Sequence, residues 1–398
     1  MNITIIGGGF GGVKTALELA KNKKHRITLI SDKADFQYYP TLYSSATGHS
    51  HRESWTPLGE IFGDHDNVNV FIDEIIDISV DKSIVVGKSG KEYSYERLVM
   101  ALGVVTTYFG IEGLETYSYG IKSEEEIRRL KHRLFVDIAE KRELDKNYVV
   151  IGAGPTGVEL AAAIGSYIKR LAKHYRLRKN TVSVKLIEAA PRVLPRSSEH
   201  TSRKVATRLK KLGVKVQTNK KVERESANEL IVSGKPVESH TVIWTSGVAN
   251  HSFFARHPSI FKLAPNGRVI VDDYMKAHDG IYVIGDNAAT KYSGLAQTAL
   301  HDAVFLAGNF NRASKRKKLR KYRAVMPISA IPVGDNWAVV EWKWIKIYGF
   351  IGAMIRKAAD LVGYSDLFPL GTSLGAWRAG MVYEHDYFTP TEKVKNRR

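Results

Sequence analysis

Two glycine-rich turns of one pattern constrain the fold of this chain more than any other feature. The first is Gly-Gly-Gly-Phe-Gly-Gly at residues 7–12, and the second is Gly-Ala-Gly-Pro-Thr-Gly at residues 152–157. Each follows a short β-branched run and precedes a helical pattern. In such a strand–turn–helix unit one glycine makes the tight turn, one lets the backbone approach a pyrophosphate, and one packs the helix on the strand. Because the helix N-terminus then faces the phosphates, the chain is predicted to bind two dinucleotides.

The order of predicted strands and helices indicates an α/β protein with two Rossmann-like dinucleotide-binding domains and a C-terminal extension. Two later strands, at residues 267–272 and 280–286, are expected to return to the first sheet. The second domain is therefore predicted to be inserted in the first. The expected boundaries are 1–115 and 265–325 for the first domain, 116–264 for the second, and 326–398 for the extension.

The formal net charge of +19 predicts attraction to an anionic partner. Basic residues cluster at 169–179 and 311–323. A solvated basic face, a membrane surface and nucleic acid are all compatible with charge alone, but no recognised nucleic-acid motif accompanies it. An anionic membrane surface is therefore the partner that we expect.

Cysteine is absent from the chain, which excludes disulfides, thiolate metal sites and redox-active thiol pairs. No metal site is predicted. No apolar run reaches the roughly 18 residues that a membrane-spanning helix needs. The chain enters its first strand almost at once, so no signal peptide is expected. We expect a peripheral protein on the cytoplasmic face of the cell membrane, or otherwise a cytoplasmic one.

An acidic residue ends the second strand of the second domain. Glu188 follows Val-Lys-Leu-Ile at residues 184–187, where a dinucleotide fold places the group that binds the adenosine ribose. A carboxylate accepts from the ribose 2′-hydroxyl and repels a 2′-phosphate, so NADH is predicted over NADPH. Arg192 lies close enough in sequence to soften this preference, and an ordinary surface glutamate is the alternative.

The corresponding strand of the first domain ends at Ser31, and its acid, Asp32, comes one residue later. Either side chain is a candidate for the ribose of that site. A third signal is the pair Gly285-Asp286 after a late strand. Such a turn can direct a carboxylate at the ribityl hydroxyls of a flavin, and the helix that follows can stabilise a reduced flavin with its positive end.

Together these motifs resemble the two-dinucleotide-binding-domain flavoproteins and, more narrowly, the type II NADH:quinone oxidoreductases. The resemblance covers residues 1–312 and includes Ala-Leu-Gly at 101–103, Trp-Thr-Ser-Gly-Val at 244–248 and Ile-Gly-Asp at 284–286. It implies that NADH passes a hydride to FAD and that a membrane quinone then takes the electrons, without proton pumping.

The resemblance also implies the residues of each site. Those expected at FAD are Gly7, Gly9, Phe10, Gly11, Gly12, Ser31, Asp32, Ala101, Leu102, Gly103, Gly285, Asp286, Ala296 and Gln297. Those expected at NADH are Gly152, Gly154, Pro155, Thr156, Gly157, Glu159, Glu188 and Gly247.

On the quinone side, the family motif Ala-Gln-x-Ala-x-Gln corresponds to residues 296–301, where the second glutamine is replaced by His301. Gln297 and His301 are the candidate catalytic residues on this side, and Glu159 is the candidate on the nicotinamide side. A histidine can donate to a quinone carbonyl and carry a proton near neutral pH. It is also compatible with another acceptor or with a structural role.

The absence of cysteine excludes relatives that need thiols beside the flavin. Two other functions stay open: a soluble NADH-dependent reductase of a protein or small-molecule acceptor, and a basic flavoprotein that binds nucleic acid. In the extension, residues 337–344 predict a strand and 347–362 an amphipathic helix. The helix is expected to contact a membrane surface, its own domain or a second copy in a homodimer. Residues 363–371 predict a structured loop.

Overall fold

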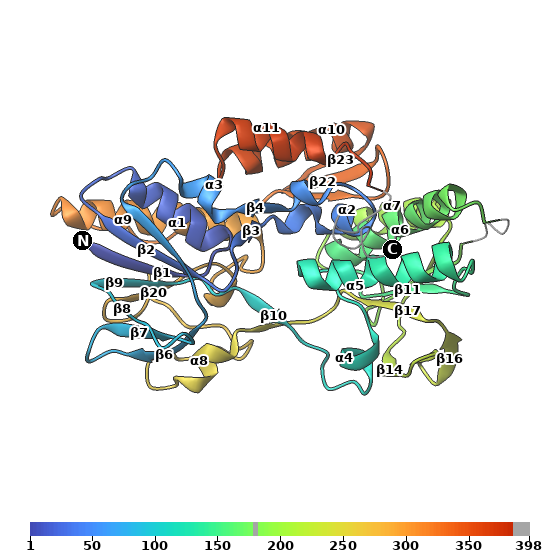
Figure 1. Cartoon of the computed structure of the whole chain (residues 1–398), viewed down its shortest axis with the longest axis horizontal. Coiled ribbons are helices and arrows are strands. Elements are labelled where there is room, and N and C mark those ends of the chain that lie inside the picture. The colour runs from blue at the N-terminus through green and yellow to red at the C-terminus, as the bar shows by residue number, and fades with distance from the viewer. Residues whose placement is uncertain (178–181, 385–398) are drawn as a thin grey trace, which may run out of the picture.

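The computed structural model describes residues 1–177 and 182–384. It has two sheets side by side, each with its own helices, and a C-terminal layer that lies across both (Figure 1). The predicted α/β fold with two Rossmann-like units is confirmed. The exact domain boundaries stay a prediction.

The first sheet has six strands in the order β19-β20-β9-β1-β2-β5, and every pair except β19–β20 is parallel. Helices α1 and α9 pack against each other on one side of it, and the small sheet β6-β7-β8 lies on the other (Figure 1). Nearly every residue of β1 and β9 is buried, because the parallel sheet is covered on both faces. This explains why both strands are almost continuously apolar. The bounds are β1 (Asn2–Ile6), α1 (Phe10–Ala20), β2 (Arg26–Ser31), β5 (Val68–Ile72), β6 (Ile75–Ser79), β7 (Ile84–Gly87), β8 (Glu92–Ser94), β9 (Arg97–Met100), β19 (Lys276–His278), β20 (Ile281–Val283) and α9 (Ala296–Ser314).

The second sheet is fully parallel and has the order β13-β12-β11-β17. Its long helix α6 begins at the second glycine turn, as α1 does at the first. The elements are α4 (Leu114–Tyr117), α5 (Glu124–Phe135), β11 (Tyr148–Ile151), α6 (Pro155–His174), β12 (Val184–Ile187), α7 (Glu199–Lys211), β13 (Val214–Gln217), β14 (Val222–Glu225), β15 (Glu229–Val232), β16 (Lys235–Glu238) and β17 (Thr241–Trp244). A short π-helical stretch, Val136–Glu140, continues α5.

Two antiparallel strands connect the units, β10 (Val104–Thr106) on the way out and β18 (Val248–Asn250) on the way back. After the short helix α8 (Ser252–Arg256), the chain rejoins the first sheet at β19 and β20. The predicted strand at 267–272 is wrong. Only Val269 pairs there, through isolated bridges to Leu263 and Ala288, because these residues run beside the sheet and not within it.

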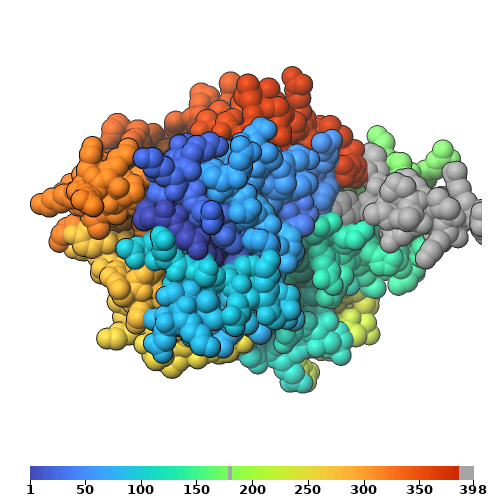
Figure 2. All heavy atoms as spheres, turned by 60° about the vertical axis from the view of Figure 1, so that its left-hand side comes forward, coloured from blue at the N-terminus to red at the C-terminus, as the bar shows by residue number. Residues whose placement is uncertain are grey.

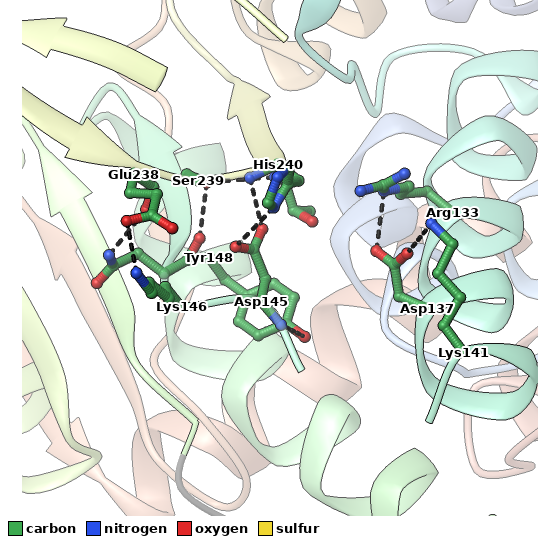
Figure 3. Close-up of polar contacts among 11 residues, drawn as sticks. Arg133, Asp137, Lys141, Asp145, Lys146, Tyr148, Glu238, Ser239 and His240 are labelled. Carbon is green, nitrogen blue, oxygen red and sulfur yellow. Dashed lines mark hydrogen bonds and ion pairs between the residues drawn. The ribbon is translucent and has the colours of Figure 1, made fainter. Parts of the chain in front are cut away.

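Polar contacts fix the amino ends of β11 and β17, the end of the second sheet away from the glycine turn (Figure 3). The backbone N–H of His240 donates to the Asp145 carboxylate at 2.8 Å. Lys146 pairs with Glu238 at 2.6 Å, and the Ser239 hydroxyl donates to the Asn147 carbonyl at 2.7 Å. Ligands bind at the carboxyl ends of parallel strands, so this cluster aligns two strands and leaves the opposite edge open.

The C-terminal extension joins the two units. Its sheet, β21 (Ser329–Pro332), β22 (Ala338–Trp342) and β23 (Ile345–Gly349), contributes to the core of the second unit. Its helices are α10 (Phe350–Ser365) and α11 (Leu370–Ala379); Tyr364 of α10 and Phe368 of the turn between them belong to the core of the first unit. The aromatic pairs Tyr38–Tyr364 and Phe36–Phe368, with ring centroids 4.3 and 5.5 Å apart, fix this contact.

Two predictions for the extension need correction. Residues 347–349 belong to β23, and the helix begins only at Phe350, because Gly349 (φ +85°) ends the strand there. The predicted loop at 363–371 is largely the end of α10 and the start of α11. The predicted strand over 337–344 is confirmed as β22. Residues 385–398 of the extension and 178–179 of the first basic cluster lie outside the described residues.

The remaining short elements belong to the loop between β2 and β5, which supplies residues to the site. They are β3 (Asp35–Gln37), α2 (Leu42–Ala46), β4 (Trp55–Pro57) and α3 (Leu58–Phe62). β3 and β4 pair with each other. This pairing holds together the two ends of the segment 38–54, which is therefore not an open loop.

Candidate functional site

The first glycine turn has the shape that a pyrophosphate requires. Gly7 has φ +110°, a conformation that side chains rarely adopt, and a Cβ on Gly12 would lie 1.8 Å from the Gly7 carbonyl oxygen. A Cβ on Gly9, by contrast, would meet no atom within 4 Å. The turn therefore packs α1 tightly on β1 and leaves open space at Gly9. A phosphate-bearing ligand can fill this space against the N-terminus of α1.

The second turn repeats this geometry. Gly152 has φ +101°, and a Cβ on Gly157 would lie 1.8 Å from the Gly152 carbonyl oxygen. A Cβ on Gly154 again would meet nothing within 4 Å. Pro155 and Thr156 start α6, where a proline needs no helical hydrogen-bond partner. The same two close approaches and the same open position support one dinucleotide in each unit.

Phe10 and Gly11, the two residues between Gly9 and Gly12 of the first turn, face the protein interior. Phe10 is buried and packs edge-on against Phe36, with ring centroids 5.1 Å apart. A Cβ on Gly11 would approach Ile284 at 3.2 Å and Ala101 at 3.6 Å. Phe10 and Gly11 thus shape the turn from behind, and a contact of Phe10 with the cofactor remains a prediction.

Ser31 and Glu188 occupy equivalent positions in the two units. The first glycine of each turn donates its N–H to the residue before them, Gly7 to Ile30 and Gly152 to Ile187, both at 2.8 Å. The Glu188 carboxylate accepts from the N–H of Ala153 at 2.6 Å and from that of Ala190 at 2.8 Å. It therefore lies against the second glycine turn, where the predicted ribose contact requires it.

In the first unit the equivalent hydroxyl is that of Ser31, which is buried and donates to the Lys33 carbonyl at 2.7 Å. Asp32 follows and is exposed. The Tyr39 ring lies near both acids of this edge. Its pKa is raised to about 12 by loss of hydration and by the carboxylates of Asp286 and Asp32. Sequence analysis did not single out Tyr39, whose only signal was its place in an aromatic run after β3.

Two further turns of the first unit are joined at the same edge of the sheet. The Gly103 N–H donates to the Asn287 side-chain oxygen at 2.9 Å, and the Asn287 amide donates to the Gly103 carbonyl at 2.6 Å. Asp286 accepts from the Gly294 N–H at 3.0 Å, and its burial raises the pKa of the carboxyl. The predicted segments around Ala101-Leu102-Gly103 and Gly285-Asp286 are therefore brought together. The side chain of Asn287 joins these two segments, and the sequence analysis did not single it out.

The start of α9 is bonded to a segment that follows it in sequence. The Gln297 amide donates to the Ile328 carbonyl and accepts from the Ile328 N–H, both at 2.9 Å. His301 donates from Nε2 to the Arg323 carbonyl at 2.9 Å. Both predicted quinone-side residues thus bind backbone in this structure, next to Ala296 at the helix N-terminus.

A buried arginine of α10 meets the site from the other side. Arg356 donates to the Pro40 carbonyl at 2.8 Å and to the Ala330 carbonyl at 3.1 Å, and it pairs with Asp360 at 3.0 Å. Pro40 follows Tyr39, and Ala330 lies two residues after Ile328. Arg356 therefore ties α10 to both segments that border the first nucleotide site. Its sequence signal, a charged pair at i and i+4, is also typical of an exposed helix face, so the contact was not foreseen.

Glu159 lies within the electrostatic field of this arginine. It belongs to the second turn of α6 and is partly buried, and burial raises its pKa to about 8. The charge of Arg356 opposes the shift and that of Asp360 adds to it. Glu159 is thus a protonated carboxyl at neutral pH, close to α10 and to Tyr43. Gly247, the other predicted NADH residue of this edge, accepts from the Lys122 ammonium at 3.2 Å.

A cavity of about 400 Å³ continues from this region between α6 and the extension. Ala163, Ser166 and Arg170 form its α6 wall, on the helix face that begins at Glu159. Asp360 and Tyr43 are also among its lining residues. In the described part of the chain no group of three or more histidine or acidic side chains is placed to hold a metal ion.

Comparison with known proteins gives consistent results. The family of pyridine nucleotide-disulphide oxidoreductases matches residues 1–303. The type II NADH:quinone oxidoreductase Ndh of Mycobacterium tuberculosis is 30% identical over 330 residues, which cover 77% of this chain and 71% of that protein. The type II NADH:quinone oxidoreductase of Staphylococcus aureus is 28% identical over 381 residues, 90% of this chain and 94% of that protein. A solved structure of NDH2 from Plasmodium falciparum in complex with NADH shares the fold, with a TM-score of 0.84 at 19% identity, and the match covers 98% of this chain and 99% of that one.

Replacing Gly9 by valine is expected to abolish FAD retention without unfolding the chain. The new side chain points into the open space at the turn, meets no protein atom at its Cβ, and starts from an ordinary φ of −89°. The flavin-to-protein absorbance ratio of the purified variant measures retention. Gly308→Ala in α9 is the control, because a Cβ there also meets nothing within 4 Å. A Gly9→Val protein that stays as yellow as the unmutated one contradicts the assignment.

Proposed function

Because the chain belongs to the pyridine nucleotide-disulphide oxidoreductase family and, within it, to the type II NADH:quinone oxidoreductases, we propose that it oxidises NADH and reduces a membrane quinone without pumping protons. The observation that carries this proposal is the pair of equivalent glycine cradles, each open at its second glycine. Bound FAD supplies the chemistry, accepting a hydride from NADH and passing electrons to the acceptor. The alternatives, a soluble reductase of another acceptor and a nucleic-acid-binding flavoprotein, receive no support from these relatives.

The residues that hold each cofactor follow from the two cradles. The turn at residues 7–12, Ser31 or Asp32, and the joined turns at 101–103 and 285–287 fit FAD. The turn at 152–157 and Glu188 fit NADH. Although its family is named for disulphide chemistry, this chain has no cysteine. A thiol relay through this chain is therefore impossible.

The acceptor site is proposed where Gln297, Arg356 and Glu159 approach the segment from Ile328 to Ala330. Gln297 and Arg356 both bond this segment, and the Glu159 carboxyl lies beyond the arginine. A quinone needs donors for two carbonyl oxygens and protons for both. Glu159, which the sequence placed on the nicotinamide side, is proposed here as the proton donor, because burial raises its pKa to about 8. His301 stays a predicted acceptor-side residue.

The outer face of the C-terminal helices is proposed to bind an anionic membrane surface. The inner face of α10 carries Gly352, Ala353 and Arg356, whereas its outer face is mostly apolar, with Lys357 also exposed. Figure 2 shows the C-terminal helices in red along one side of the molecule, with the chain after α9 in orange beside them. The exposed apolar side chains are Phe350 (63%), Ile351 (62%), Met354 (56%), Val362 (68%) and Leu370 (71%).

Lipid fits this face better than a second copy of the chain, because cations flank it. Trp344 is 83% exposed, between the exposed Lys343 and Lys346, and the basic run at 315–323 lies beyond α9. Apolar and aromatic side chains bordered by lysines suit the headgroup layer. None of the described helices is long and apolar enough to cross a membrane. We propose peripheral attachment through the apolar face, on the cytoplasmic side.

Steady-state oxidation of NADH and NADPH with ubiquinone or menaquinone tests the function. We expect quinone-dependent turnover and a preference for NADH of roughly tenfold, about 1.4 kcal/mol, because Glu188 favours a free 2′-hydroxyl. Glu188→Gln should narrow that preference. Glu238→Gln, in β16 and paired with Lys146 near the amino end of β11, should leave it unchanged. Reduction of ferricyanide but of neither quinone would overturn the proposal.

The protonated state of Glu159 predicts a pH dependence. Because burial raises its pKa to about 8, the carboxyl can donate a proton below pH 8 and loses that ability as the pH rises through 8. Flavin reoxidation by quinone in stopped flow should therefore slow above pH 8, while flavin reduction by NADH should not. In Glu159→Gln the reoxidation rate should be lower and independent of pH in this range.

Glu225→Gln is the matched control, because Glu225 is also buried and its pKa is also raised to about 8, but it lies in β14 of the second unit. Its pH profile should match that of the unmutated enzyme. If the reoxidation rate of Glu159→Gln falls with pH just as that of the unmutated enzyme does, Glu159 is not the proton donor on the acceptor side.

Replacing Phe350 and Ile351 by serine is expected to weaken binding to vesicles that contain anionic phospholipid by at least about tenfold, since two large apolar side chains leave the lipid. Vesicle co-sedimentation measures this, and ferricyanide reduction should be unchanged. Serines at the exposed Ile72 and Ile76 of the first unit are the control. Unchanged vesicle binding together with loss of a dimer in sedimentation would show instead that a second copy covers this face.

A further inference from the structure

A segment without helix or strand, residues 315–328, runs back along α9; we call it the strap. Five side chains of α9 hold it, in antiparallel order, beginning with Arg312, which donates to the Lys318 carbonyl at 2.6 Å. Asn309 accepts from the Arg320 N–H at 3.0 Å and donates to the Arg320 carbonyl at 2.9 Å. His301 binds the Arg323 carbonyl and Gln297 binds Ile328, as described above. Asp302 accepts from the Tyr322 hydroxyl at 2.6 Å.

Asp302 differs from the other four in being completely buried and in having a second partner outside the strap. It is 0% exposed, and its second oxygen accepts from the Gly285 N–H at 3.0 Å. A buried carboxylate persists only where donors replace water. Burial raises the pKa of Asp302 to about 6, so the group is still ionised at neutral pH and can accept at both oxygens.

The Gly285 N–H belongs to the turn that the FAD assignment depends on. Gly285 has φ +67°, and a Cβ there would already touch Ala299 of α9 at 3.3 Å. The next residue is Asp286, the predicted ribityl ligand, and Asn287 then fixes the turn to Gly103. The N–H of Gly285 is thus the point at which α9 holds this turn by a charged hydrogen bond.

We propose that Asp302 is a positioning residue for the cofactor: it holds the Gly285-Asp286 turn through the Gly285 N–H, and the Tyr322 hydroxyl of the strap holds Asp302. The proposal rests on the FAD site proposed above. It adds a requirement that the strap be docked on α9 for FAD to bind tightly. Asp302 itself needs no contact with the cofactor or the substrates.

FAD release from the full-length holoenzyme tests this proposal. When the holoenzyme is diluted, the fluorescence of the released FAD gives the dissociation constant. Asp302→Ala removes both bonds and should raise that constant by at least about tenfold, the scale of one hydrogen bond to a charged group. Asp302→Asn keeps an acceptor for Gly285 and a donor for Tyr322, and it should restore most of the affinity. Tyr322→Phe loses only the hydroxyl, keeps the ring contact with Phe305, and should weaken binding by about threefold or more.

Asn309→Ala is the matched control, since it loosens the same strap from the same helix without touching the turn. It should lower the thermal stability as much as Tyr322→Phe does and leave FAD affinity unchanged. Unaltered FAD affinity in Asp302→Ala would overturn the proposal, as would an equal loss in Asn309→Ala. If Asp302→Ala does not fold, Tyr322→Phe against Asn309→Ala decides in the same way. An unmutated protein that binds no FAD would instead refute the FAD site itself.

Discussion

The close packing of one helix on one strand at each glycine turn is the constraint on which the rest of this structure depends. At Gly12 and Gly157 any side chain would collide with the carbonyl of the first glycine, 1.8 Å from its Cβ. Because this contact is so close, the N-termini of α1 and α6 point at the carboxyl ends of their strands. The second glycine then leaves the space that a pyrophosphate can enter.

A single buried guanidinium joins the rest of the molecule to this arrangement. Arg356 donates to two carbonyls from distant parts of the chain and pairs with Asp360 inside the protein. Such a group is costly to bury and is strongly destabilising when a partner is lost, so it specifies how α10 sits on the two units. With Arg356 and Asp360 turned inward, α10 presents mostly apolar residues to the outside. The proposed membrane face is therefore a consequence of the same arginine.

A second network fixes the first nucleotide site from the other direction. Asn287 joins the turns at Gly103 and Gly285, and Asp302 holds the Gly285 N–H from α9. The strap, bound along α9, contributes Tyr322 to that carboxylate. The cofactor edge of the first sheet is thus held by side chains from the turn after β20, from α9 and from the strap. Strand and helix geometry alone would leave these turns free to move.

Local sequence patterns predicted the α/β fold with one unit inserted in the other, the two glycine turns and the position of Glu188. These are local: a tight turn needs glycine, and a strand end is read from the residues around it. The predictions were wrong at 267–272, where β-branched residues run beside a sheet, and at the start of α10. The partners of Arg356, the inward orientation of Arg356 and Asp360, and the contacts of Asn287 and Asp302 became visible only in the folded chain. Their partners lie far away in the chain, and the burial that raises the pKa of Glu159 is a property of packing that no local pattern records.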